Sequence, residues 1–384
     1  MATRRPPNRK AQILEAAGVL FRERGYHNVS VAEVAEAAGI TAPAVYRHFR
    51  NKEELLLDAV LGSLDAVEGR IRDAAGLDDM LRAMASAAVT RRSVAALWER
   101  EARHLPDAQR GLVQNRASDV TERLAGRVRE ARPDVEAADS RLVALAMLAV
   151  MASTSRHRLS LPRRRFEALL HQLGERVLRC PLPAPAATAA PRPPRAVAAL
   201  QPSRREQVLA EATRLFDERG FQSVAMADIG EAVGIVGSGV YRHFATKTDI
   251  LIAATSRGGD RMLVAFDQAV SRASSPRNAV EAAFRSHVQL GVEQSHVIGV
   301  ITNEREQLPE RERTALRRFQ REYLEMWVRL LDQAVPGRDP VETRMIVVAA
   351  QGMARYVVRW ARPAPDQELV ERVVAMGTAL LLPD

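Results

Sequence analysis

The feature that most constrains this chain is an internal repeat with an offset of 195 residues. The segment FRERGYHNVSVAEVAEAAGITAPAVYRHFRNKEELL, residues 21–56, aligns with FDERGFQSVAMADIGEAVGIVGSGVYRHFATKTDIL, residues 216–251. About half of the positions are identical, and most of the others are conservative. A match of this length indicates duplication, so the chain must fold as two related units.

The duplication extends in both directions from this segment. Upstream, Ile13, Ala17 and Phe21 have the spacing of one helix face, and so do the apolar residues 195 positions later. Downstream, EREARHLPDAQR at 99–110 resembles TNEREQLPERER at 302–313. Each copy is therefore a whole domain, and the length of 384 residues suits two or more domains.

A proline-rich segment separates the copies. PLPAPAATAAPRPPRAVAALQP, residues 181–202, contains seven prolines and almost no large apolar side chain. Such a composition cannot form a core and favours extended polyproline geometry. We expect a semi-rigid linker.

Outside the linker the pattern predicts an all-α fold. Strand-type alternation is absent, and glycines and prolines cut the chain into helical lengths. The apolar run Leu142–Ala152 has about half the length of a membrane span, which predicts a buried core helix and no membrane partner. The single cysteine, Cys180, excludes an internal disulfide and a cysteine-based zinc site. No apolar segment typical of a secretory signal follows the basic N-terminus, so we expect an intracellular protein.

The repeated segment has the local signals of a helix-turn-helix. Ser30, followed three residues later by a glutamate, predicts a capping box at the start of a short helix. Gly39 suits the turn that follows it, and Thr41 can cap a second short helix with Pro43 in its first turn. Val45 should face inward. In this motif the second helix is the usual reader of the DNA major groove.

The sequence SVAEVAEAAGITAPAVYRHFRNKEELL closely resembles the DNA-binding unit of the tetracycline-repressor (TetR/AcrR) family, and both halves of the chain match. The resemblance implies two TetR-like units in tandem, each with a helix-turn-helix domain and a helical ligand-binding and dimerisation bundle. The implied domains are helix-turn-helix domains at 1–60 and 203–255, helical regulatory domains at 61–180 and 256–384, and the linker at 181–202. It further implies a cytoplasmic repressor that binds a double-stranded DNA operator and is released by a small apolar or amphipathic effector.

The resemblance also assigns residues to DNA. In the first copy, Tyr46, His48, Lys52 and Thr41 would contact phosphates, while Ala42, Pro43, Ala44 and Arg47 lie on the outward face. The three small residues would suit contact with thymine methyls, and Arg47 could bond a guanine edge or a phosphate. The corresponding positions of the second copy are Gly237, Ser238, Tyr241, Arg242, His243 and Lys247.

The second copy is expected to bind DNA more weakly than the first. Ala225 and Val236 replace two capping residues that are typically worth about 1 kcal/mol each. Gly237 and Gly239 add flexible positions to the reading helix. The net charge is +2 for residues 1–60 and −1 for residues 203–255.

The remaining helices show no catalytic, metal-binding or cofactor-binding pattern, and we expect neither an enzyme nor a cofactor. Candidate residues of an apolar effector pocket are Trp98, His104, Met147 and Met151 in the first copy and Tyr323, Trp327, Gln351 and Tyr356 in the second. These residues could equally be bundle core. The alternative function is a DNA-binding or bridging protein whose helical domains only mediate association.

Members of the family pair two identical chains through their last two helices. Here both partners are present in one polypeptide, which favours an internal pseudo-dimer, although a homodimer is possible. The candidate interface helices are 138–153 with 166–178, and 342–360 with 367–382. Fully extended as polyproline, the 22-residue linker would reach about 70 Å.

Overall fold

The computed structural model describes residues 9–90, 92, 97, 101–183, 203–361 and 366–382. Helices make up its elements, and no strand occurs in these ranges. The predicted all-α fold is confirmed.

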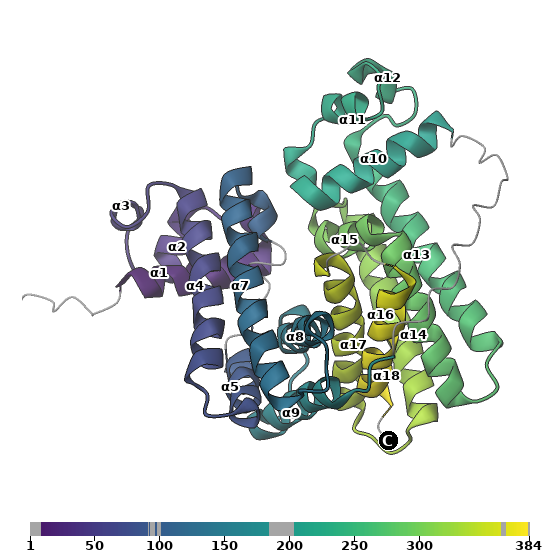
Figure 1. Cartoon of the computed structure of the whole chain (residues 1–384). Coiled ribbons are helices and arrows are strands. Elements are labelled where there is room, and N and C mark those ends of the chain that lie inside the picture. The colour runs from purple at the N-terminus through teal and green to yellow at the C-terminus, as the bar shows by residue number, and fades with distance from the viewer. Residues whose placement is uncertain are drawn as a thin grey trace, which may run out of the picture. The chain divides into compact units, whose positions relative to one another are not determined.

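The two copies share most of their helix order (Figure 1), but α15 of the second copy has no counterpart among the elements described for the first, and η4 of the first has none in the second. The first contains α1 (Arg9–Arg24), η1 (Tyr26–Asn28), α2 (Val31–Ala37), α3 (Ala42–Tyr46), α4 (Lys52–Asp73), α5 (Leu77–Thr90), η3 (Ala102–His104), α7 (Asp107–Ala131), α8 (Ala137–Ala152), η4 (Ser153–Arg156) and α9 (Arg163–Arg179). The second contains α10 (Arg204–Arg219), η5 (Phe221–Ser223), α11 (Met226–Ala232), α12 (Gly237–Val240), α13 (Lys247–Ser271), α14 (Pro276–Glu293), α15 (Ser295–Asn303), η6 (Arg305–Gln307), α16 (Glu310–Ala334), α17 (Pro340–Trp360) and α18 (Gln367–Leu381). Helices α7 and α16 occupy the same place in their copies, and each has 25 residues.

The contacts divide the chain into two compact units. One comprises Met1–Ala144 and Val150–Gly174, and the other comprises Leu145–Ala149 and Glu175–Asp384. Apart from its first three residues, the predicted linker lies outside the described ranges.

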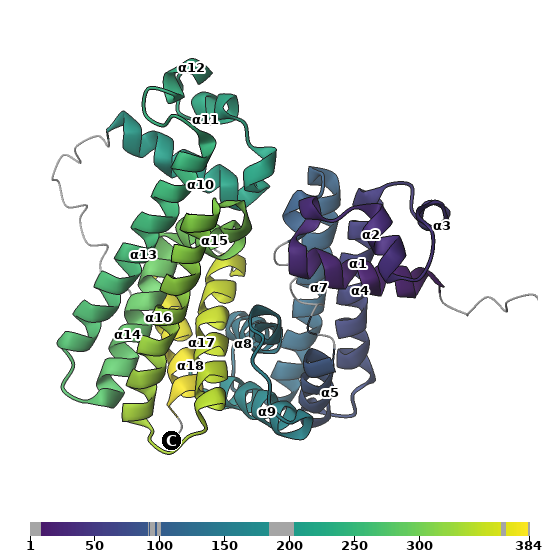
Figure 2. The same ribbon diagram turned by 180° about the vertical axis from the view of Figure 1, so that it is seen from behind.

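Each copy begins with a small group of helices that we call its head. The first head consists of α1–α3 and the start of α4, and the second consists of α10–α12 and the start of α13. In the first copy α4 runs from the head alongside α7 (Figure 1). In the second copy α13, α14, α16, α17 and α18 form a bundle, which we call the second bundle, with the head at one end (Figure 2).

The apolar faces read from the sequence form the cores of the heads. Ile13, Ala17 and Phe21 of α1 are fully buried, as are Val208 and Phe216 of α10. Burying a large apolar side chain contributes about 1.5–3 kcal/mol. These faces therefore fix the long first helix of each head against its short helices.

One helical stretch in the described part of the chain, Ala137–Arg156, is long and apolar enough to cross a membrane. Its apolar window is 72% buried inside the protein. Burial of this extent is what a core helix shows, as predicted for Leu142–Ala152.

Candidate nucleic-acid interface

Local hydrogen bonds at the start of α2 and one glycine after its end shape the helix-turn-helix of the first head. The Ser30 hydroxyl accepts a hydrogen bond from the Glu33 N–H (3.2 Å), and the Glu33 carboxylate accepts one from the Ser30 N–H (2.7 Å), which confirms the capping box. Gly39 has a φ of 67°, and an added Cβ would meet nothing within 4 Å. The glycine is therefore needed for its left-handed backbone and not for space.

Helix α3 separates a buried face from an exposed one. Val45 and Phe49 are 1% and 2% exposed, whereas Tyr46 is 54% exposed. Arg47 and His48 are exposed beside Tyr46. Of the other residues predicted to contact DNA, Thr41 and Pro43 are exposed, and Ala42, Ala44 and Lys52 are half-buried. The structure brings this set together around one short helix.

One predicted cap is absent. Thr41 lies at the N-cap of α3, but its side chain makes no cap hydrogen bond. The prediction that Thr41 and Val236 differ by a cap is therefore wrong, because neither side chain caps its helix. The remaining cap difference is at Ser30, since Ala225 has no side-chain acceptor and keeps only the bond from its N–H to Asp228 (2.7 Å).

The lysine that opens the last helix of each head lies against the short turn that follows the first helix, η1 or η5. Lys52 Nζ is 4.2 Å from the centre of the Tyr26 ring, and burial lowers the pKa of this lysine. Lys247 Nζ donates to the carbonyl oxygens of Phe221 and Val224, both at 2.7 Å. Two of its three N–H groups are thus used within the head, which leaves one for a phosphate.

The second head presents a shorter reading helix. Helix α12 has four residues where α3 has five. Tyr241 is 56% exposed, close to the value for Tyr46. Ser238 and Arg242 are also exposed, His243 and Lys247 are half-buried, and Gly237 begins the helix. The aromatic and basic residues keep the arrangement of the first head.

Two cations that lie over the buried aromatic rings of Phe49 and Phe244 were not predicted. Lys10 Nζ lies 5.3 Å from the centre of the Phe49 ring and pairs with Asp58 at 2.6 Å. The guanidinium of Arg205 lies 4.2 Å from the centre of the Phe244 ring. Cations over aromatic faces are attracted by the ring quadrupole. The repeat contained this signal, because positions 10 and 205 are both basic and differ by the repeat offset.

In the first copy, a buried carboxylate joins the head to the helices that follow. Glu101 is 1% exposed and accepts a hydrogen bond from the Tyr26 N–H at 2.8 Å. His27 Nε2 and His104 Nδ1 are 3.2 Å apart and share a hydrogen bond. The His104 ring also stacks on Tyr26, with ring centres 5.7 Å apart. His104 was predicted to line an effector pocket, but the structure places it at this junction.

In the second copy, an ionic group lies at the corresponding junction. Asp217 of α10 is 2% exposed, and both of its carboxylate oxygens are 3.0 Å from Arg359 Nη1 of α17. His296 Nδ1 of α15 lies 3.0 Å from the same carboxylate. A further contact joins the side-chain amides of Gln222 and Gln307. The second head is thus fixed to its bundle by charge as well as by packing.

Two of the predicted effector-pocket residues meet in an aromatic cluster of the second bundle. The Trp327 ring centre is 6.3 Å from that of Tyr323, 6.0 Å from His287 and 5.2 Å from Phe266. Burial lowers the pKa of His287 to about 4 and raises that of Tyr323 to about 12, so both are neutral at pH 7. The Trp327 indole N–H is buried without a hydrogen bond of good geometry, and its interaction with the Tyr323 hydroxyl partly offsets the effect of burial on the pKa of that tyrosine.

The other predicted pocket residues are buried but are not shown to converge. Met147 and Met151 are buried in α8, Tyr356 is buried in α17, and the side-chain nitrogen of Gln351 is buried without a partner. Trp98 lies outside the described residues. A surface hollow of about 330 Å³ at the junction of α4 and α5 contains none of them.

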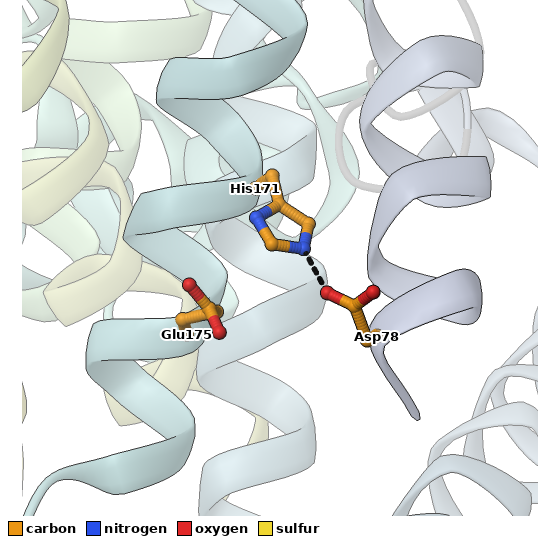
Figure 3. Close-up of side chains that lie close together, drawn as sticks. All are labelled: Asp78, His171 and Glu175. Atoms are coloured by element: carbon orange, nitrogen blue, oxygen red, sulfur yellow. Dashed lines mark hydrogen bonds and ion pairs between the residues drawn. The ribbon is translucent and has the colours of Figure 1, made fainter. Parts of the chain in front are cut away.

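Among the described residues, one group has the donor types for a metal ion. Asp78, His171 and Glu175 have ligand atoms within 4.8 Å of one another, and Asp78 and His171 are joined at 2.7 Å (Figure 3). Arg82 pairs with Asp78 at 2.7 Å, and Arg179 pairs with Glu175 at 2.8 Å. Because both carboxylates already have cationic partners, we assign no metal here.

The chain matches known protein families over more than half of its length. The N-terminal model described as "Bacterial regulatory proteins, tetR family" matches twice, at residues 13–59 and 208–254. A model described as "Tetracyclin repressor-like, C-terminal domain" matches residues 273–380. The two N-terminal matches coincide with the two heads.

Relatives known as transcriptional regulators agree with these matches. The transcriptional repressor KstR2 of Rhodococcus jostii is 36% identical over 107 residues, which are 25% of this chain and 52% of that protein. The transcriptional activator FasR of Mycolicibacterium smegmatis is 38% identical over 66 residues, 17% of this chain and 30% of that protein. The chain therefore spans about half or less of these relatives. The solved complex of AibR with isovaleryl coenzyme A and operator DNA is 21% identical, with a TM-score of 0.38, and covers 46% of this chain and 95% of that one.

Proposed function

This chain belongs to the TetR family of bacterial regulatory proteins, with two N-terminal domains in one polypeptide, and we propose that it represses transcription by binding an operator through both heads. The observation that carries the proposal is the division of α3 and α12 into buried and exposed faces. Val45 and Val240 anchor the helices, while Tyr46 and Tyr241 are more than half exposed beside arginines. This arrangement suits insertion of a short helix into the major groove.

The first head supplies the larger share of the binding energy. It has the Ser30 cap and a net charge of +2, whereas the second head has a shorter reading helix and a net charge of −1. A gel-shift assay on the DNA upstream of the protein's own gene tests this ranking. Tyr46→Ala with Lys52→Ala should weaken binding more than Tyr241→Ala with Lys247→Ala, and the reverse order would contradict it.

Arg47 reads a base edge. Its side chain is exposed at the C-terminal end of α3, where a guanidinium can bond a guanine in the major groove. Arg47→Ala should relax the preference at one base pair by about 1–3 kcal/mol. Arg318→Ala, at an exposed site of α16, is the matched control and should leave binding unchanged. Equal weakening on all operator variants would make Arg47 a phosphate contact.

The effector is an uncharged, largely apolar molecule that binds at the aromatic cluster of the second bundle. The rings of Tyr323 and Trp327 supply an apolar surface, and His287 is held neutral. The indole N–H, which makes no hydrogen bond of good geometry, offers one donor. A thermal-shift screen against a metabolite library should find a compound that raises the melting temperature and releases DNA. The shift should be lost in Trp327→Ala and kept in Trp360→Phe. A saturating screen without any such compound would favour the alternative, in which the helical domains only mediate association.

The two copies act as an internal pair in the cytoplasm. The duplication provides two heads in one chain, and the linker is long enough to join them as partners. Covalent linkage also raises the effective concentration of the partner to roughly millimolar. Since the heads differ in sequence, the operator should have two unlike half-sites, in contrast to the palindrome of a homodimer.

A further inference from the structure

The two copies make the same contact between head and following helices with different residues. His27 and His104 meet in the first copy, at 3.2 Å between Nε2 and Nδ1. Gln222 lies 195 positions after His27, and Gln307 precedes the repeated Leu-Pro pair just as His104 does. These two glutamines are hydrogen-bonded to each other. The first copy therefore has two titratable histidines at the position where the second copy has two neutral glutamines.

The charged groups around the histidine pair come from several elements. Glu101 lies next to it, with Oε2 at 3.8 Å from His104 Nε2. Lys52 at the start of α4 and Arg103 of η3 act on His27 with positive charge. From α7, Arg110 donates to the carbonyl oxygen of Arg103. The pair thus has one buried carboxylate and two cations as close neighbours.

We propose that the His27–His104 contact is a proton-sensitive coupling between the first head and its regulatory helices, and that the second head lacks it. A hydrogen bond between two imidazoles needs one ring nitrogen as donor and the other as acceptor. When solvent protons occupy both rings, both nitrogens are donors, and two positive charges face each other across the contact. Acid therefore loosens the first head while the glutamine pair of the second head is unaffected.

The direction of the pH effect follows from the state of His27. Burial lowers its pKa below 6.5, and the charges of Lys52 and Arg103 act in the same direction, against that of Glu101. The docked head therefore binds fewer protons than the released head as the pH falls below 6.5, so docking weakens with acid. One proton changes the docking equilibrium by at most about tenfold per pH unit. Its consequence for the operator rests on the proposed DNA-binding function.

Hydrogen exchange on the full chain without DNA tests the coupling. The Tyr26 amide, which donates to Glu101, reports docking of the first head, and the segment 221–224 is the internal control from the second. Between pH 7.5 and 5.5, after correction for intrinsic exchange, protection of residues 26–29 should fall several-fold. Protection of residues 221–224 should not fall, because the titratable group at the second junction, His296, lies 3.0 Å from the Asp217 carboxylate and a proton on it would strengthen that contact.

Swapping the histidine pair and the glutamine pair between the two copies by mutation completes the test. His27→Gln with His104→Gln should abolish the loss of protection that acid causes in the first head. Gln222→His with Gln307→His should give the second head the acid response, and this variant carries the test if the first one fails to fold. The proposal is overturned if acid lowers the protection of both segments equally in the wild type, or if the loss in the first segment persists without the two histidines. Because no DNA is used, such a failure would leave the proposed repressor function untouched.

Discussion

Replacing Arg359 by methionine should release the second head from its bundle. The Asp217 carboxylate is almost completely buried, and Arg359 Nη1 contacts both of its oxygens at 3.0 Å. Burial raises the pKa of Asp217, but the hydrogen bond from His296 and the charge of Arg359 bring it below the usual 3.8. The carboxylate is therefore ionised at pH 7. Of its two partners, Arg359 and His296, only His296 would remain in the methionine variant.

The size of the destabilisation expected for Arg359→Met follows from the burial of the two charged side chains. Removing one partner of a fully buried ion pair costs about 3–5 kcal/mol. The Arg359 side chain is 37% exposed, so water screens part of its charge, and His296 still donates to the carboxylate. We expect a loss of roughly 1–3 kcal/mol. Since the pKa of Asp217 is depressed in the folded state, the stabilisation is present above pH 3.8 and is lost as the pH falls through the lower folded value.

Urea unfolding at pH 7 measures the loss in the free energy of unfolding. Hydrogen exchange of α10 shows whether this loss arises in the second head. Arg355→Met is the matched control, because Arg355 lies one turn earlier on α17 and donates to the hydroxyl of Thr302 at 2.7 Å. Loss of a bond to this neutral acceptor should cost about 1 kcal/mol. A loss in Arg359→Met no larger than in the control would refute the role given to Asp217.

Three further predictions concern folding, binding and assembly. Ser30→Ala should cost about 1 kcal/mol in urea unfolding, because it removes the cap of α2. Thr41→Ala should cost much less, since that hydroxyl makes no cap bond, and an equal loss would contradict the structure. Operator affinity should fall steeply with salt because Lys and Arg contacts to phosphate release counterions, and a flat dependence in a gel shift would exclude a phosphate-dominated interface. Light scattering at micromolar concentration should give a mass near 42.3 kDa, whereas a stable species of twice that mass would contradict the internal pair.

The heads could be predicted from the sequence because their structure is local. A capping residue, a glycine with positive φ and an apolar spacing determine each short helix, and the Ser30 box, Gly39 and the buried Val45 are all found as expected. The sequence does not show whether a residue at an N-cap position makes the capping hydrogen bond. Thr41 has the right residue type at the right position, yet its hydroxyl does not bond to the backbone.

Contacts between segments far apart in the chain could not be predicted. Glu101 and Tyr26 are separated by 75 positions, and Asp217 and Arg359 by 142. Nothing in the local pattern indicates that a particular acidic residue will be buried against a particular donor. For the same reason His104 was assigned to a pocket, although its ring lies on Tyr26.

The central claim is that two unlike heads in one chain read one asymmetric operator. Selection of bound sequences from a random double-stranded DNA library by the purified full chain tests it most directly. We predict enrichment of two different half-sites at a fixed spacing, with the half-site of the first head more strongly specified. Enrichment of a perfect palindrome, or of no sequence at all, would contradict the account.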